Sequence, residues 1–599
     1  MALGSIAPPE EQPEAALAPW PGSHDMPRWN VGQLVDAPTF TWKNWFAMLG
    51  PGLLVGGSAI GGGEWLAGPA VTARYGGALM WLATLSIVGQ VFYNFEISRY
   101  ALYTGEPIFT GKFRTLPGPR FWLFMYLLLD FGAVFPYLAA NAATPLAAIY
   151  LGRIPNGPQE ESLVRGLGIV VFLAAMLPLI FGGKIYDTLK KVMSFKIVTV
   201  LGFLLFIAIF FSSGSTWREI VTGFFRFGTV PIQRGEDTNG NGVLDPGEDW
   251  DGDGHLDVIE PALPPTIDSD GDGRPDAWAD INGDGNPDKF QDLDGDGTRD
   301  GDSTENVFVS LIEGRGFPTI DFSTIALLAA FAAIAGCGGL SNAPISNYTR
   351  DQGWGMGHCV GAIPSLVGGH NIELSHVGMV FDATPESLPR WRRWLRHVLR
   401  DQLVVWMPAC FLGMALPSML SVQFLRRGTE VSKWYAAGMT ADGVQGAVAT
   451  AWGGLAGSVV WYMTLLCGFL VLAPAMATSA DGIIRRWVDV VWTSSRRLRV
   501  WDPKHIKTLY FGVLIGYMVL GLFLLSTGEP LALLTIATNI MNFALGFSCF
   551  HTLVINCTLL PKALRPGWFA IAGMAGAGVF FFSLAGISAA ETLRAYWSS

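Results

Sequence analysis

The sequence predicts an all-α membrane protein with about eleven transmembrane helices. Half of its 599 residues are hydrophobic and only 15% are charged, whereas soluble domains carry about 25% charged residues. Apolar windows long enough to cross a hydrocarbon core, which needs about 20 residues per helix, recur along the whole chain. These windows are expected to be helices because every backbone amide inside lipid must be hydrogen-bonded, and they lack the ten-residue alternation of a membrane barrel.

The apolar windows fall into two sets of five spans and one further span. The first set covers residues 45–213, the second covers 322–557, and the eleventh helix covers 567–589. Residues 1–40 are rich in Pro, Ala and acidic residues, a composition that builds no core, so they are expected to form a disordered tail. Residues 214–321 form a long loop that joins the two five-helix repeats.

The distribution of Lys and Arg orients these spans. Basic residues collect in the loops after the second, fourth, sixth and eighth spans, and Arg485 and Arg486 are assigned to the last of these loops. Because cytoplasmic loops carry an excess of basic residues, the N-terminus is expected to be cytoplasmic, with the C-terminus and the 214–321 loop outside. We therefore expect an integral, multi-pass protein in the lipid bilayer of a plasma membrane or a bacterial inner membrane.

The first and sixth spans are predicted to be broken. Five Gly lie between positions 56 and 63, directly before Glu64, and residues 335–342 read Ala-Gly-Cys-Gly-Gly-Leu-Ser-Asn. Each Gly costs about 1 kcal/mol in a helix, and a charge inside the membrane costs a further 2.5–3.5 kcal/mol or so. Small residues also let helices pack closely. Interruptions at corresponding positions of two repeats nevertheless indicate a substrate site at mid-membrane in an inverted-repeat transporter.

The predicted transport site combines one acid with small polar residues and freed backbone. Oxygen ligands of this kind suit Mg²⁺, Mn²⁺ or Ca²⁺, whereas the Cys337 thiol is either a softer ligand or simply a small side chain. In the other interpretation, Glu64 is a proton or Na⁺ site coupled to an organic substrate. The candidate residues are Ser58, Gly61, Gly62, Gly63, Glu64, Gly336, Cys337, Ser341 and Asn342.

Asp130 is a second acid within an apolar span. An ionisable group inside a membrane helix is by default a functional candidate, here a proton relay. The alternative is a structural acid that is capped or paired.

Several stretches resemble the Nramp (natural resistance-associated macrophage protein) metal transporters. Residues 50–65, ending in Gly-Gly-Gly-Glu-Trp, and residues 75–81, Tyr-Gly-Gly-Ala-Leu-Met-Trp, resemble the family's first helix. Residues 99–105, Arg-Tyr-Ala-Leu-Tyr-Thr-Gly, resemble the end of its second helix, and Asp130 stands where the family has a third-helix aspartate. The resemblance implies a leucine-transporter-like 5+5 inverted repeat with broken first and sixth helices, and divalent metal transport that is commonly accompanied by proton movement.

The chain departs from the family motif at the metal site. Gly61 replaces the family's metal-binding Asp, Glu64 replaces its Asn, and Ala133 stands where a second third-helix acid is found. The Met-Pro-His motif of the sixth helix is absent from residues 335–342. The chain is therefore similar to a divergent branch of the family, and its standard manganese or iron specificity is not supported.

An acidic insert lies inside the 214–321 loop. Residues 236–305 hold 22 acidic and 3 basic residues, which is a net charge of −19. The whole chain has a net charge of −10, so the rest of the chain is basic, and the total charge gives no indication of nucleic-acid binding. Two units that begin twelve residues apart, at Asp237 and Asp249, and three shorter units that begin twelve apart, at Asp268, Asp280 and Asp292, place carboxylates or amides at alternate positions with Gly at the turn. Calcium loops of the EF-hand or thrombospondin type 3 kind require this pattern. The alternative is an acidic linker. The expected ligands are Asp237, Asn239, Asn241, Val243, Asp245, Glu248, Asp249, Asp251, Asp253, His255, Asp257, Glu260, Asp268, Asp270, Asp272, Asp280, Asn282, Asp284, Asp292, Asp294 and Asp296.

These features predict a secondary transporter that moves a divalent cation such as Mg²⁺ or Mn²⁺ by alternating access. Transport requires no cofactor, the external loop binds calcium, and the sequence indicates no particular protein partner. One alternative is a carrier of an amino acid or another small organic solute on the same fold, and another is a calcium-sensing membrane protein that has lost transport. An enzyme is not expected, since no nucleophile–base pair, phosphate loop or catalytic metal motif stands out.

Overall fold

The computed structural model of the chain describes most of the predicted membrane part. The described residues are 18–19, 22–39, 63–155, 160–181, 185–232, 304–361, 374–425, 438–502, 505–527 and 530–598, with the single positions Gly52, Gly61, Val243, Arg427 and Thr429. Except for Val243, all the predicted calcium ligands lie outside these residues, as do Ser58 and Gly62 of the predicted transport site.

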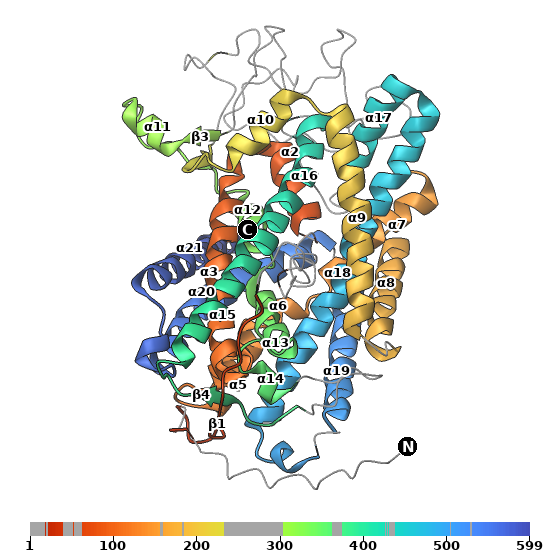
Figure 1. The fold of residues 1–599 in the computed structure, drawn as a ribbon. Helices are drawn as coiled ribbons and strands as arrows, with labels where there is room; N and C mark the ends of the chain where they lie inside the picture. The colour runs from red at the N-terminus through yellow and green to blue at the C-terminus, as the bar shows by residue number, and fades with distance from the viewer. Residues whose placement is uncertain are drawn as a thin grey trace.

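Most of the described residues are helical (Figure 1). The first repeat contains η2 (Gly63–Ala67), α2 (Gly68–Tyr75), η3 (Gly76–Leu79), α3 (Trp81–Thr104), α4 (Ile108–Arg114), α5 (Pro119–Leu129), α6 (Phe131–Val134), α7 (Tyr137–Leu151), α8 (Glu161–Phe181) and α9 (Ile185–Phe211). The connection contains α10 (Gly214–Gly223), β2 (Thr229–Pro231), β3 (Thr304–Asn306) and α11 (Val307–Ile312).

The second repeat and the final helix follow. They contain α12 (Ile325–Ile334), η4 (Gly339–Asn342), α13 (Pro344–Asp351), α14 (Gly357–Val360), β4 (Met379–Phe381), α15 (Ser387–Arg400), η5 (Asp401–Trp406), α16 (Met407–Phe424), α17 (Thr440–Trp452), α18 (Gly454–Ser494), η6 (Leu498–Val500), α19 (Ile506–Thr527), α20 (Pro530–Thr558), η8 (Lys562–Leu564) and α21 (Trp568–Ser598). Strand β1 (Asn30–Gly32) precedes both repeats.

Within the described residues, eight helices are long and apolar enough to cross a membrane, and a ninth candidate is the pair Glu64–Leu79 and Trp81–Thr104, which is bent by 97°. Large apolar side chains on these helices point away from the protein, for example Val170 and Leu177 on α8 and Val519 and Phe523 on α19. Such outward apolar faces belong against lipid. The chain is an integral, multi-pass membrane protein.

The sixth span is broken where the glycines predicted it. Helix α12 ends at Ile334, and regular helix resumes only at η4 and α13. Gly336, Gly338 and Gly339 have φ angles of +113°, +39° and +59°, which residues with a Cβ rarely adopt. For the first span, the described helix begins at Gly63, next to Glu64.

Two predicted boundaries need correction. The third span is not one helix, because the chain leaves helical geometry at Phe135 and Pro136 between α6 and α7. Arg485 and Arg486 do not lie in a loop, since α18 continues to Ser494 and both side chains are buried. Both arginines are paired with acids, so hydropathy alone ended the eighth span too early.

The two ends of the acidic insert are held together. Strands β2 and β3 pair antiparallel, with Thr229 opposite Asn306 and Pro231 opposite Thr304. The 72 residues between these strands (232–303) therefore leave and return at one place. In Figure 1, α10, α11 and α17 lie at one end of the molecule, and β1 and β4 lie at the other. The strands that flank the insert thus lie at the end of the molecule opposite to β1 and β4.

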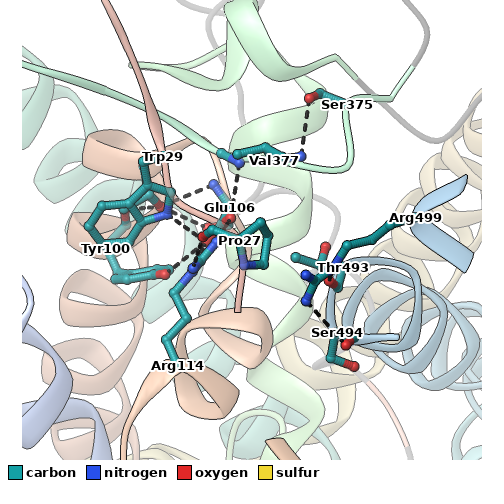
Figure 2. A network of polar contacts seen from close by, with 12 residues as sticks. Pro27, Trp29, Tyr100, Glu106, Arg114, Ser375, Val377, Thr493, Ser494 and Arg499 are labelled. Carbon is teal, nitrogen blue, oxygen red and sulfur yellow. Dashed lines mark hydrogen bonds and ion pairs between the residues drawn. The ribbon is translucent and has the colours of Figure 1, made fainter. Parts of the chain in front are cut away.

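Residues 22–39 fall within the predicted disordered tail, yet they pack against the end of the bundle that holds β1 and β4. Their anchor is the Glu106 carboxylate (Figure 2), which accepts hydrogen bonds from Trp29 Nε1 at 3.1 Å and from the backbone N–H of Gly378 at 3.0 Å. Arg114 forms a buried ion pair with the same carboxylate. Strand β1 pairs in parallel with β4 beside this network.

We expect Glu106→Gln to loosen the 22–39 segment. Burial raises the pKa of the Glu106 carboxyl, but the Arg114 charge and the hydrogen bonds outweigh burial and hold the pKa below its ordinary value of 4.5. A depressed carboxylate pKa stabilises the fold above the unfolded-state pKa, and this stabilisation is lost as the pH falls below about 4.5. Hydrogen–deuterium exchange across β1 should rise about tenfold or more at pH 7 in the variant, since breaking a buried pair costs about 3–5 kcal/mol.

Asp36→Asn is the matched control, because Asp36 pairs with Arg393 at an exposed position and such pairs contribute little. Equal exchange in both variants would show that Glu106 does not anchor the segment.

Candidate functional site

Glu64 joins the first span to the break in the sixth. Its side chain is 1% exposed, one carboxylate oxygen accepts the backbone N–H of Gly61 at 3.0 Å, and the other accepts the N–H of Gly336 at 3.2 Å. The two glycines are 275 positions apart in the sequence. One acid thus accepts a backbone N–H from the residues just before η2 and another from the break in the sixth span, which meets the need for backbone hydrogen bonds in a dry interior.

Gln90 on α3 forms hydrogen bonds with further groups at the break in the sixth span. Its Nε2 donates to the Ala335 carbonyl at 2.8 Å, and its Oε1 accepts the backbone N–H of Cys337 at 3.1 Å and Asn342 Nδ2 at 2.6 Å. Ser86, one turn earlier, donates to the Ala332 carbonyl at 2.5 Å. The sequence analysis missed both residues, although a Ser and a Gln four positions apart within an apolar span were the available signal.

Lys196 on α9 brings a basic group to the same region. It is 0% exposed, and its Nζ has no hydrogen-bond partner within the described part of the chain. It interacts electrostatically with Glu64 and Cys337. Lys196 is not among the site residues predicted from the sequence, because the basic residues just before it indicate a loop, although a Lys inside an apolar span is itself a functional signal.

Tyr137 at the start of α7 and Cys410 on α16 complete the surroundings of Glu64. Both are close enough to interact electrostatically with Glu64 and with Cys337. The candidate site is therefore built from both repeats: η2, α3, α7 and α9 from the first, and the break after α12 together with α16 from the second.

The structure brings together most of the predicted transport residues that it describes. Gly61 and Gly336 donate their backbone N–H groups to Glu64. The neighbouring Cys337 and Asn342 donate to Gln90, and Gly63 opens the helix that carries Glu64. Ser341 lies in η4, where its backbone N–H donates to the Gly338 carbonyl at 3.1 Å.

The site offers few ligands to a metal ion. No group of three or more His, Cys, Asp or Glu side chains that could hold a metal occurs among the described residues. Glu64 is the acid here, and the Asn342 Oδ1 atom is a buried oxygen for which the described residues supply no hydrogen-bond partner. An ion with its own water shell would suit such a site better than one that needs full protein coordination.

Asp130 lies in a separate buried cluster. Its carboxylate pairs with Arg486 at 2.5 Å and accepts Trp487 Nε1 at 2.7 Å, and Arg486 also donates to the Leu340 carbonyl at 3.3 Å. This arrangement matches the paired acid that was considered as an alternative to a proton relay. It also ties α18 to the far side of the sixth-span break.

Further ion pairs close the bundle near the ends of α13 and α18. Arg350 pairs with Asp489 at 2.6 Å, and Arg485 pairs with Asp481 at 2.7 Å and with Asp351 at 3.3 Å. All five side chains are buried or nearly so. They join the helix that follows the sixth-span break to the long helix of the eighth span.

Glu64 is thus a buried acid beside the break in the sixth span, in a bundle of membrane helices that come from both halves of the chain. No family model matches the sequence, and no curated protein matches it either. Among solved structures, a point mutant of the Eremococcus coleocola manganese transporter matches with a TM-score of 0.51 and 12% identity, covering 94% of this chain and 90% of that one.

A second structure of the same transporter, in complex with an aromatic bis-isothiourea substituted compound, matches over the same shares of the two chains with 12% identity and a TM-score of 0.49. The likeness to the first of these two structures, with its TM-score of 0.51, shows the fold alone at 12% identity. The chain has the all-α transporter fold that its resemblance to the Nramp family implied.

Asp130→Asn should destabilise the protein strongly. The change leaves the buried Arg486 guanidinium without its carboxylate, and breaking a buried pair costs about 3–5 kcal/mol. Thermal unfolding of the purified protein in detergent measures the loss, and the double variant Asp130→Asn/Arg486→Met should recover part of it. Glu591→Gln breaks a largely exposed pair with Arg594 and should leave the melting temperature unchanged. An equal melting temperature in wild type and Asp130→Asn would contradict a structural role.

Proposed function

We propose that the protein is a secondary carrier that moves a divalent metal cation, such as Mg²⁺ or Mn²⁺, across the membrane by alternating access. The observation that carries the proposal is the buried Glu64 carboxylate, which lies between two interrupted spans and contacts both. The shared fold with a manganese transporter supports the same class of cargo.

Glu64 supplies the charge that a cation needs at mid-membrane. Each of its oxygens accepts one of the two hydrogen bonds to Gly61 and Gly336, and a carboxylate has about four acceptor positions, so capacity remains for an ion or for its water. Asn342 Oδ1 and the bare backbone around the break are the further oxygen donors. Hard oxygen ligands of this kind favour Mg²⁺ or Mn²⁺ over softer metals.

Proton coupling forms the finer part of the proposal, with Asp130 as the proton carrier. Its carboxylate is held by Arg486 and Trp487, so the pair has to open before Asp130 takes up a proton. Arg486 also donates a hydrogen bond to the Leu340 carbonyl at the sixth-span break. Opening the Asp130–Arg486 pair would therefore change a contact next to the transport site.

Glu64→Gln should abolish metal uptake while the protein still folds and inserts. The amide keeps the shape, and its single oxygen can still accept the N–H of Gly61 or of Gly336, but it removes the charge that faces the cation. A pair of unit charges about 4 Å apart at an effective dielectric constant of about 20 is worth about 4 kcal/mol, which corresponds to roughly thousandfold weaker binding. Uptake of Mn²⁺ and Mg²⁺ into proteoliposomes is the measurement.

The matched control is Glu161→Gln, at the exposed start of α8, where Glu161 pairs with Arg165. It should transport as the wild type does. Unchanged uptake by Glu64→Gln would remove Glu64 from the mechanism.

The second candidate is a carrier of a small zwitterionic solute such as an amino acid. Lys196 is the observation that favours it, because an acid and a base in one buried region can pair with the ammonium and the carboxylate of such a solute. Competition of amino acids with Mn²⁺ in the same uptake assay separates the two candidates.

We propose further that the acidic insert binds calcium. The support is its twelve-residue spacing of acids and glycines, together with the β2–β3 pairing that returns the chain to its starting point. External calcium loops typically bind at about 10⁻⁴–10⁻³ M.

Removing calcium should therefore expose the insert to proteases. Without bound ions, the repulsion among its 22 acidic residues opposes any compact state. Limited proteolysis of the purified protein with millimolar calcium, and again with a chelator, should place new cleavage sites between residues 236 and 305 only in the second case. Asp249→Asn, at the first position of one loop, should raise the calcium concentration needed for protection. Identical digestion patterns with and without calcium would refute calcium binding.

A further inference from the structure

We propose that Lys196 is an internal cation that competes with the transported metal ion for Glu64. This inference rests on the function proposed above. When the site is empty, the Lys196 ammonium takes the place of the metal beside the Glu64 carboxylate, and a metal ion that binds displaces it. Lys196 thereby determines both how tightly the site holds a metal and how readily the empty carrier changes conformation.

The first support is that Lys196 is buried without a hydrogen bond. Its side chain is 0% exposed, and its Nζ finds no hydrogen-bond partner in the described ranges. An ammonium group can donate three hydrogen bonds, and leaving these donors without acceptors in a dry interior costs several kcal/mol. A long basic side chain kept in such a place is poised for a partner that this conformation does not provide.

Another fully buried lysine shows what a structural role looks like. Lys112 on α4 donates to Ser548 Oγ and to the Tyr93 hydroxyl at 3.4 Å, and its Nζ lies 4.8 Å from the centre of the Tyr126 ring. Its charge is thus met by hydrogen bonds and by an aromatic face. Lys196 has no equivalent set of hydrogen bonds among the described residues, so structural burial of an amine does not explain it.

The second support is the position of Lys196 relative to Glu64. The two groups interact electrostatically, yet within the described residues no ion pair shorter than 4.0 Å joins them, and Glu64 is bonded to the backbone of Gly61 and Gly336 instead. The four-carbon side chain of a lysine is flexible, and the Glu64 oxygens retain acceptor capacity. In the proposed mechanism, a change of the lysine rotamer or of α9 brings the two charges together.

Charge arithmetic shows why this matters for transport. Glu64 and Lys196 sum to zero when the lysine is protonated, so the empty site is neutral and its burial in the closed intermediate is inexpensive. A divalent ion beside Glu64 leaves a net charge of +1, and a nearby ammonium adds one more. Like charges in a low dielectric repel strongly, so the metal and the ammonium exclude each other from the carboxylate.

Replacing Lys196 by Met tests this mechanism in two measurements. Mn²⁺ binding to the purified protein, followed by titration calorimetry, should become about tenfold tighter or more, because the competing charge is gone. In proteoliposomes, net Mn²⁺ uptake into metal-free vesicles should slow about tenfold, since the empty carrier now returns with an unpaired Glu64. Exchange of Mn²⁺ between loaded compartments should stay within about twofold of the wild type, because exchange never requires the empty carrier to return.

Matched variants guard the interpretation. Lys196→Arg keeps the charge and should resemble the wild type. Lys196→Gln also removes the charge, so it takes the place of Lys196→Met in both measurements if the Met variant fails to fold. Lys562→Met removes an exposed lysine on η8 and should change nothing. Since the Met side chain needs no hydrogen bond, the melting temperature should stay equal or rise.

The outcomes separate the inference from the function on which it rests. An unchanged Mn²⁺ affinity and an unchanged ratio of exchange to net uptake in Lys196→Met would overturn the internal-cation role while leaving metal transport intact. Loss of amino-acid binding in Lys196→Met, where the wild type binds an amino acid, would overturn it in favour of a zwitterionic substrate. Absence of Mn²⁺ and Mg²⁺ binding from the wild type and all variants would refute the proposed function itself.

Discussion

The architecture depends on how the backbone of two interrupted spans is satisfied inside a bundle that excludes water. The Glu64 carboxylate accepts one N–H from each interrupted segment, and Gln90 serves an N–H and a C=O on the sixth-span break with a single side chain. A backbone group without a hydrogen bond in lipid costs several kcal/mol. Non-helical backbone is therefore tolerated at this place because these two side chains supply its hydrogen bonds. A site for a small ion follows from that arrangement.

Local features of this arrangement can be predicted from the sequence, and features that depend on distant partners cannot. Clustered glycines beside Glu64 indicate a break because their backbone cost is paid locally. Gln90 and the anchor of residues 22–39 cannot be predicted from the sequence because each is defined by a contact more than 70 positions away, such as Trp29 with Glu106. Lys196 is obscured locally, because the basic residues just before it indicate a loop. Hydropathy predicts a loop at Arg486 because a hydropathy scale scores each charged residue by itself. In the structure, Arg486 lies in the membrane part as an ion pair with Asp130.

Pairing also explains how so many ionisable groups are accommodated near the membrane part. Asp130 with Arg486 and Asp489 with Arg350 each combine one acid and one base, which lowers the cost of removing them from water without making them a source of large net stability. These pairs connect α18 to the junction of α5 and α6 and to α13, the helix that follows the sixth-span break. A rearrangement of the break would therefore have to exchange such contacts, which gives the protein discrete states instead of a continuous deformation.

Glu64 and Lys196 stand apart from this pattern, since they interact through space without forming an ion pair in the described conformation. A carboxylate that shares its oxygens with two backbone amides is held in place on both repeats, while the lysine is held by nothing comparable within the described residues. The acid is thus the fixed element and the base the movable one. A fixed negative charge with a movable positive charge nearby is the minimum needed for a site that stays neutral when empty and still accepts a cation, and both charges come from the first repeat.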